Sequence, residues 1–269
     1  MEKVFISDKT LKQTGKKLPL SFREKIELSR LIDRLEVDTI ELPAISNKKV
    51  DFLLIKSISS AVKQAEVAVP VALEAESVQT TWNALKEAPS ARLQVSIPVS
   101  SVQMEYLTHL KPAVVRERVV ETIRECKKHT DNIELISEDA FRGERSFLIS
   151  LVNAAIEAGA TMITFQEAAG TSLPEEVGQI LAEIMSEIGP KEKIRFGIDC
   201  SDDLSLADAC AVETVRQGIR EIKTAAFPIG CASLINVARI LALKGEKMNV
   251  SCHVRREEIH RVIRLISSL

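Results

Sequence analysis

Two cations accompany a set of carboxylates and amides that could together bind an anionic substrate. Lys12 and Arg142 suit a carboxylate or a phosphate, and arginine can hold two oxygens of one group. Glu41 and Glu138 could orient these cations or transfer protons. The other polar residues of this set are Asp8, Glu74, Glu76, Gln103, Gln13, Asp139, Gln166, Glu167, Asp199, Ser201, Asp202 and Asp203.

These residues share one position, at or just after the end of a short apolar run rich in β-branched residues. Such runs are typical of buried strands. They predict strands at residues 4–6, 39–42, 67–73, 93–97, 133–136, 162–165, 194–198 and 221–225.

Helical patterns with ordinary start and stop signals separate the predicted strands. Ser21 and Glu24 form a capping-box pattern, and Pro112 and Pro174 stand where a first helical residue would be. Helix ends are indicated by Gly159, Gly189, Gly218 and Gly245.

The alternation of strands and helices predicts an α/β fold, a closed (β/α)8 TIM barrel with one extra C-terminal helix. A doubly wound open sheet is the alternative, but no GxGxxG follows the first strand. We expect residues 1–245 to form the barrel and residues 246–269 a C-terminal helical extension. In such barrels the chemistry lies at the carboxyl ends of the strands.

Composition narrows the class of protein. The 269 residues are 45% hydrophobic and 28% charged, which supports a large core. A net charge of −2 gives no reason to expect nucleic-acid binding. The N-terminus lacks a signal-peptide pattern, no stretch is apolar enough to cross a membrane, and the five cysteines are scattered. We therefore expect a cytoplasmic protein with reduced thiols.

Six segments, in order, resemble the α-isopropylmalate synthase and homocitrate synthase family of metal-dependent Claisen-condensing barrels. The opening FISDKTLKQTG is similar to the family's Asp-x-Thr-Leu-Arg-Asp-Gly motif. The others are VDTIELPA, SSVQMEYL, IELISEDAFR, ITFQEAAGTSLPEEV and DCSDDLSLADA, and the resemblance extends from Phe5 to about Leu243. Among these segments, the one ending at Arg142 is closest to homocitrate synthases.

The resemblance implies roles for this chain's residues. Lys12 and Glu138 would be catalytic, and Arg142, Glu41, Gln103 and Glu167 would bind the substrates, acetyl-CoA and a 2-oxo dicarboxylic acid such as 2-oxoglutarate. The family's metal-binding acid falls on Gln13, its two histidines on Asp199 and Ser201, and a neighbouring asparagine on Asp202. These four positions are degenerate, so the family's metal site is not expected here.

Several alternatives remain open from the residues alone. An oxygen-only site of Asp199, Asp202 and Glu167 could hold Mg²⁺ or Mn²⁺, although Asp202 also fits a helix cap. Arg142 could bind a substrate carboxylate or pair with Glu138 or Asp139.

Three hypotheses follow for the whole chain. The first is a subunit of a homocitrate synthase-type acyltransferase that depends on a second synthase subunit. Nitrogen-fixing clostridia have such a split enzyme, whose homocitrate supplies the iron-molybdenum cofactor, and this chain resembles its alpha subunit. The second is a non-catalytic oxo-acid-binding or scaffolding homologue. The third is a lyase that acts through Lys12.

Overall fold

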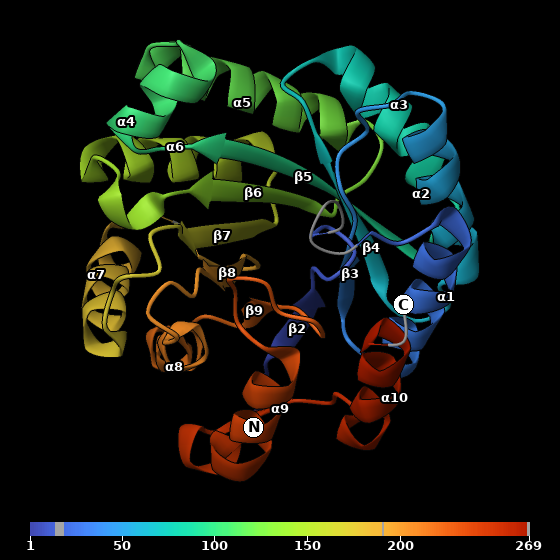
Figure 1. The fold of residues 1–269 in the computed structure, drawn as a ribbon. Helices are drawn as coiled ribbons and strands as arrows, with labels where there is room; N and C mark the ends of the chain where they lie inside the picture. The colour runs from blue at the N-terminus through green and yellow to red at the C-terminus, as the bar shows by residue number, and fades with distance from the viewer. Residues whose placement is uncertain (14–18, 190, 268–269) are drawn as a thin grey trace.

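A closed barrel of eight parallel strands forms the centre of the protein (Figure 1). The structure, a computed structural model, describes residues 1–13, 19–189 and 191–267. Hydrogen bonds join the strands in chain order and close the barrel between the last strand and the first. The barrel strands are β2 (Phe5–Asp8), β3 (Thr39–Glu41), β4 (Glu66–Val71), β5 (Ser90–Pro98), β6 (Ile133–Glu138), β7 (Met162–Glu167), β8 (Arg195–Cys200) and β9 (Glu221–Thr224).

Each of the eight predicted strands overlaps one barrel strand, so the predicted α/β class and (β/α)8 barrel are confirmed. In several cases the observed strand extends beyond the carboxyl end predicted from the sequence. Asp8, Glu138, Glu167 and Cys200 are the last residues of their strands and do not lie in the following loops. Hydrogen bonds of the sheet therefore hold their backbones in place.

Helices surround the barrel, and the predicted start signals are confirmed. The Ser21 hydroxyl accepts a hydrogen bond from the Glu24 backbone N–H (3.3 Å), and the Ser21 N–H donates to the Glu24 carboxylate (2.6 Å). Pro112 and Pro174 are the first residues of their helices. The helices are α1 (Phe22–Arg34), α2 (Val50–Ala61), α3 (Ala75–Leu85), α4 (Ser101–Gln103), α5 (Pro112–Lys127), α6 (Arg145–Ala158), α7 (Pro174–Glu187), α8 (Ala207–Glu213), α9 (Leu234–Lys244) and α10 (Arg256–Ser267).

Short irregular helices complete the chain. A π-helix, η1 (Met104–Thr108), follows α4, and three 3-10 helices are η2 (Ala140–Arg142), η3 (Thr214–Gln217) and η4 (Gly245–Met248). Within residues 1–13, 19–189 and 191–267, none of the helices combines the length and apolar character that a membrane span requires.

A second, two-stranded sheet joins the two ends of the chain. Strand β1 (Glu2–Lys3) pairs in parallel with β10 (Val250–Ser251). Helix α10 then packs against α1 and α9 (Figure 1). Strands of two residues carry no hydrophobic period, which is why the sequence did not reveal this sheet. The division into residues 1–245 and 246–269 stays a prediction.

The interior of the barrel is charged, whereas branched apolar residues usually dominate such interiors. Arg92 on β5 pairs with Glu221 on β9, and Lys223 on β9 pairs with Glu134 on β6. These strands are not neighbours in the sheet, so the ion pairs cross the interior.

Candidate active site

Lys12 lies beyond the end of β2, at the mouth formed by the carboxyl ends of the barrel strands. Its ammonium nitrogen is 2.7 Å from Oε2 of Glu41 and 3.1 Å from Oε1 of Gln94. The side chain is 28% exposed, so the cation is fixed but open to solvent. The positive charge of Lys12 and its place at the mouth both fit the predicted role of binding an anion.

Glu41 is the fully buried carboxylate that fixes this cation. It also pairs with Lys223 and accepts a hydrogen bond from the Ser7 hydroxyl (2.8 Å). Burial by itself would raise the pKa of Glu41, but the charges of Lys12 and Lys223 hold that pKa well below its usual range. Glu41 is therefore a permanent anion that orients Lys12.

Charges continue from Glu41 down the barrel axis. The Lys223 ammonium is 2.7 Å from Oε1 of Glu134, and Glu134 lies 3.6 Å from the Arg92 guanidinium. Arg92 in turn makes a 2.6 Å contact with Glu221. This buried ion ladder, consisting of Glu41, Lys223, Glu134, Arg92 and Glu221, links the mouth to the opposite end of the barrel.

Lys9 is a second cation of the mouth, and reasoning from strand ends missed it. It directly follows Asp8, its side chain is 14% exposed, and its ammonium pairs with Asp199 at the end of β8. Gln166 also donates to Asp199, at 3.2 Å. Burial would lower the pKa of Lys9, but Asp199 outweighs that effect and raises it, so Lys9 remains charged.

Gln13 and Ser201, two degenerate family positions, converge on Cys231. The Gln13 amide nitrogen is 2.8 Å from the Cys231 sulfur, and Ser201 forms an isolated antiparallel backbone bridge with Cys231. Burial raises the pKa of the Cys231 thiol, although Lys9 and Gln13 partly oppose this. The mouth near the ends of β2 and β8 therefore contains an amide, a thiol and an ammonium–carboxylate pair.

The predicted oxygen-only metal site does not assemble. Asp199 faces Lys9, Asp202 accepts a hydrogen bond from the Ala207 N–H (2.9 Å) at the start of α8, and Glu167 accepts one from the Gly170 N–H (2.7 Å). Across the described ranges, no three His, Cys, Asp or Glu side chains gather in a way that could hold a metal ion. The capping interpretation of Asp202 fits this geometry, and the residues present do not fit the family's metal.

Arg142 and Glu138 lie on the side of the mouth formed by β6 and η2. Arg142 makes a two-point ion pair with Asp139, at 2.7 and 3.0 Å, while its side chain stays 58% exposed. The hydrogen bond and charge of Asp139, followed by the charge of Glu167, raise the pKa of Arg142. Glu138 accepts a hydrogen bond from the Ser96 hydroxyl. The predicted pairing of Arg142 is found with Asp139.

Two further predicted residues shape loops. Gln103 ends α4, where its backbone N–H donates to the Ser100 hydroxyl (3.4 Å). Asp8 is buried and accepts a hydrogen bond from the Ala226 N–H (2.8 Å), which ties the ends of β2 and β9 together. Burial raises the pKa of Asp8 from 3.8 to about 6, although hydrogen bonds from Thr10 and Ala226 oppose the effect.

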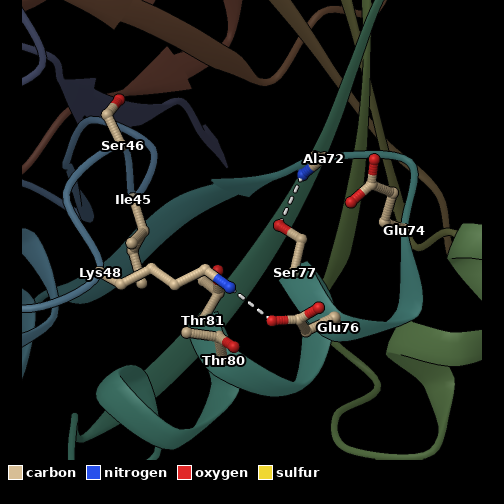
Figure 2. Close-up of a pocket in the computed structure, with 9 residues that line it drawn as sticks. All are labelled: Ile45, Ser46, Lys48, Ala72, Glu74, Glu76, Ser77, Thr80 and Thr81. Atoms are coloured by element: carbon tan, nitrogen blue, oxygen red, sulfur yellow. Dashed lines mark hydrogen bonds and ion pairs between the residues drawn. The ribbon is translucent and has the colours of Figure 1, made fainter.

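A pocket of about 190 Å³ opens on the rim, between the segments that follow β3 and β4 (Figure 2). Lys48 bridges it by an exposed ion pair with Glu76 (2.5 Å), and the Ala72 N–H donates to the Ser77 hydroxyl (2.9 Å). Glu74 also lines this pocket (Figure 2). Glu74 and Glu76, predicted from strand ends, thus belong to the rim and not to the Lys9–Lys12 mouth.

Comparison with known proteins places this geometry in a family. The model of the HMGL-like family matches residues 3–266. The chain belongs to the HMGL-like family. This confirms the resemblance to the isopropylmalate and homocitrate synthases.

Relatives and solved structures agree with the family and with the fold. The 2-isopropylmalate synthases of Aquifex aeolicus and Carboxydothermus hydrogenoformans are 32% and 30% identical over 98% and 100% of this chain, but only 52% and 54% of their own lengths. The chain thus spans about half the length of these curated relatives. The HMG-CoA lyase of Bacillus subtilis superposes with a TM-score of 0.81 at 15% identity, covering 100% of this chain and 94% of the lyase, which supports the barrel fold.

Proposed function

We propose that this chain is a subunit of a homocitrate synthase-type acyltransferase, which condenses acetyl-CoA with 2-oxoglutarate and depends on a second synthase chain. Membership of the HMGL-like family and the 2-isopropylmalate synthase relatives support condensation of an acyl-CoA with a 2-oxo acid. The homocitrate-type acceptor is supported by the segment that ends in Arg142.

The observation that carries the proposal is that the mouth keeps cations suited to an acidic substrate but not the family's metal-binding side chains. Lys12 is fixed by a buried carboxylate and Arg142 by Asp139, so cations for an acidic substrate are in place. Gln13 instead contacts a thiol and Asp199 an ammonium, while Ser201 bridges to Cys231 through its backbone. The chain can therefore bind an oxo acid, whereas the metal-dependent part of the reaction falls to the partner chain.

The reaction forms one carbon–carbon bond. A base removes a methyl proton from acetyl-CoA, the enolate carbon attacks the keto carbon of 2-oxoglutarate, and water then releases homocitrate and CoA. Arg142 directs Nε and Nη2 to Asp139, which leaves the Nη1 protons for a substrate carboxylate. Lys12 would donate to the second carboxylate or the keto oxygen, and Glu138 is the candidate base.

Reconstitution with the partner tests this proposal. The chain would be expressed alone and together with a second synthase chain from the same genome, and thiol release from acetyl-CoA would be followed with 2-oxoglutarate present. We expect turnover only in the mixture, together with co-purification of the two chains. Ordinary turnover by the isolated chain would refute its dependence on a partner.

A non-catalytic oxo-acid-binding or scaffolding homologue is the second candidate, and the failure of the mouth to fit the family's metal favours it. Calorimetry with 2-oxoglutarate and other dicarboxylates would compare the wild type with Arg142→Ala. Arg145→Ala is the matched control, because Arg145 is an arginine paired on the outer surface with Glu183 (2.6 Å). Binding without turnover under all pairings would favour this candidate. Equal binding by wild type and Arg142→Ala would remove Arg142 from the site.

The proposed location is the cytoplasm. The proposed substrates, acetyl-CoA and a 2-oxo acid, would be supplied there. Reduced cysteines are also typical of that compartment, and Cys126, Cys200, Cys210 and Cys231 are buried free thiols.

A further inference from the structure

The Lys9 ammonium lies at the point of the mouth where the degenerate family positions meet. Asp199 binds it directly, and its charge acts on the Cys231 sulfur, to which the Gln13 amide is hydrogen-bonded. Ser201, two residues beyond Asp199, bridges to the same cysteine. The Lys9 ammonium thus binds one of the residues at the degenerate metal positions, Asp199, and lies near the cysteine that Gln13 contacts.

We propose that Lys9 is the resident cation of this mouth, so that the 2-oxo acid binds to the ammonium groups of Lys9 and Lys12 without a divalent metal. This inference rests on the proposed function, because it names how the same substrate is held. It concerns binding by this chain and leaves the condensation step to the complex.

The charge of the Lys9 ammonium and its free donor protons suit it to bind a substrate. An ammonium has three donor protons, and Asp199 accepts one of them. Both Lys9 and Lys12 lie close enough to Glu41 for its charge to act on them, which places two cations beside one buried anion. Lys9 and Lys12 each pair with a carboxylate, Asp199 and Glu41 respectively, so a dicarboxylate entering between them would bind to their remaining donor protons.

The same ammonium opposes a divalent ion. Two like charges at the separation of neighbouring ligands repel strongly in a site that is largely shielded from water. A protonated thiol is also a poor ligand for Mg²⁺, which prefers oxygen ligands. The side-chain oxygen of Gln13 is buried without a hydrogen-bond partner among the described residues, so it can accept a hydrogen bond from a bound ligand or water.

Two measurements on the folded chain test the inference. Calorimetry with 2-oxoglutarate would be run in a chelator and again with Mn²⁺, for the wild type, Lys9→Met and the surface control Lys244→Met. We expect the affinity of the wild type to be the same in both buffers within about twofold. We expect Lys9→Met to weaken binding by about tenfold or more, the usual effect of losing a charge-assisted hydrogen bond, and Lys244→Met to have no effect. Circular dichroism would establish that each variant is folded.

The second measurement needs no variant. Electron paramagnetic resonance of free Mn²⁺, titrated with the wild-type chain, is expected to show no stoichiometric binding. One Mn²⁺ bound per chain, binding of the oxo acid that requires Mn²⁺, or equal affinity of wild type and Lys9→Met would each overturn the inference while leaving the proposed function standing. No binding of 2-oxoglutarate in either buffer would instead count against the proposed function itself.

Discussion

Lys223 is the most informative position for testing how the barrel interior is stabilised. Its side chain is 1% exposed and lies between Glu41 and Glu134, both fully buried. In Lys223→Met, Glu41 keeps its ion pair with Lys12, and Glu134 keeps its longer one with Arg92 at 3.6 Å. Both carboxylates also keep neutral hydrogen bonds, Glu41 from Ser7 and Glu134 from Gln94 and Thr164. Removing one partner of a buried ion pair typically costs about 3–5 kcal/mol, because a charge is left uncompensated.

Urea unfolding at pH 7 would measure this cost, with Trp82 fluorescence and far-UV circular dichroism as probes. The pKa of Lys223 is raised, so its contribution is present at pH 7 and is lost only in strong alkali. The pKa of Glu41 is lowered, so its contribution is also present and is lost only in acid. At pH 7 the measured loss therefore reports Lys223 and Glu41 in their charged forms. The surface variant Lys244→Met should change the free energy of unfolding by less than about 0.5 kcal/mol.

A double variant separates the uncompensated charge from lost packing. Glu134→Gln removes the carboxylate that Lys223→Met leaves underpaired, so the double variant should be more stable than the sum of the two single losses, by about 1–3 kcal/mol. Simple additivity, or a loss below about 1 kcal/mol in Lys223→Met, would refute the view that the ladder is tightly coupled.

Three further outcomes are expected. Because the pKa of Asp8 rises from 3.8 to about 6, protonation favours the folded state, so the stability of the wild type relative to Asp8→Asn should fall by about 2.4 kcal/mol from pH 4 to pH 7 in urea titrations. Gly170→Ala should lower the melting temperature more than Gly230→Ala. Both glycines have a positive φ, +67° and +66°, so both variants carry the same backbone strain. A Cβ at Gly170 would in addition lie 2.5 Å from the Asp203 nitrogen, whereas a Cβ at Gly230 would meet no atom within 4 Å. Burial raises the pKa of the Cys200 thiol, so a thiol reagent should modify it only after unfolding, and rapid modification of the native chain would contradict its placement.

Local patterns were enough to predict the barrel and the carboxylate that orients Lys12. Strands such as residues 162–167 stand out because β-branched and apolar residues follow a glycine that ends a helix, and both signals are local. Gly159, with φ +116°, is such a helix end. Lys12 and Glu41 were paired correctly because the ends of neighbouring parallel strands meet at one face of the barrel.

Long-range ion pairs could not be predicted in the same way. Lys9 occupies the variable position of its motif, and its partner Asp199 is 190 residues away, so neither residue indicates the other locally. Lys223 lies inside a strand, where alternation usually marks a polar residue as solvent-facing. In this barrel it faces an interior that already contains carboxylates. Only the assembled fold shows that charge balance across the interior selects a lysine there.

Under the proposed function, charge balance would also explain how binding of the oxo acid and its condensation are separated in this chain. A single charge on Lys9, already neutralised in part by Asp199, attracts a carboxylate but polarises a keto group far less than a divalent ion does. Under that proposal, such a mouth would bind an oxo acid without a strong Lewis acid of its own. The isolated chain should therefore bind substrate more readily than it turns substrate over, and a partner that contributes the stronger electrophile would restore the reaction.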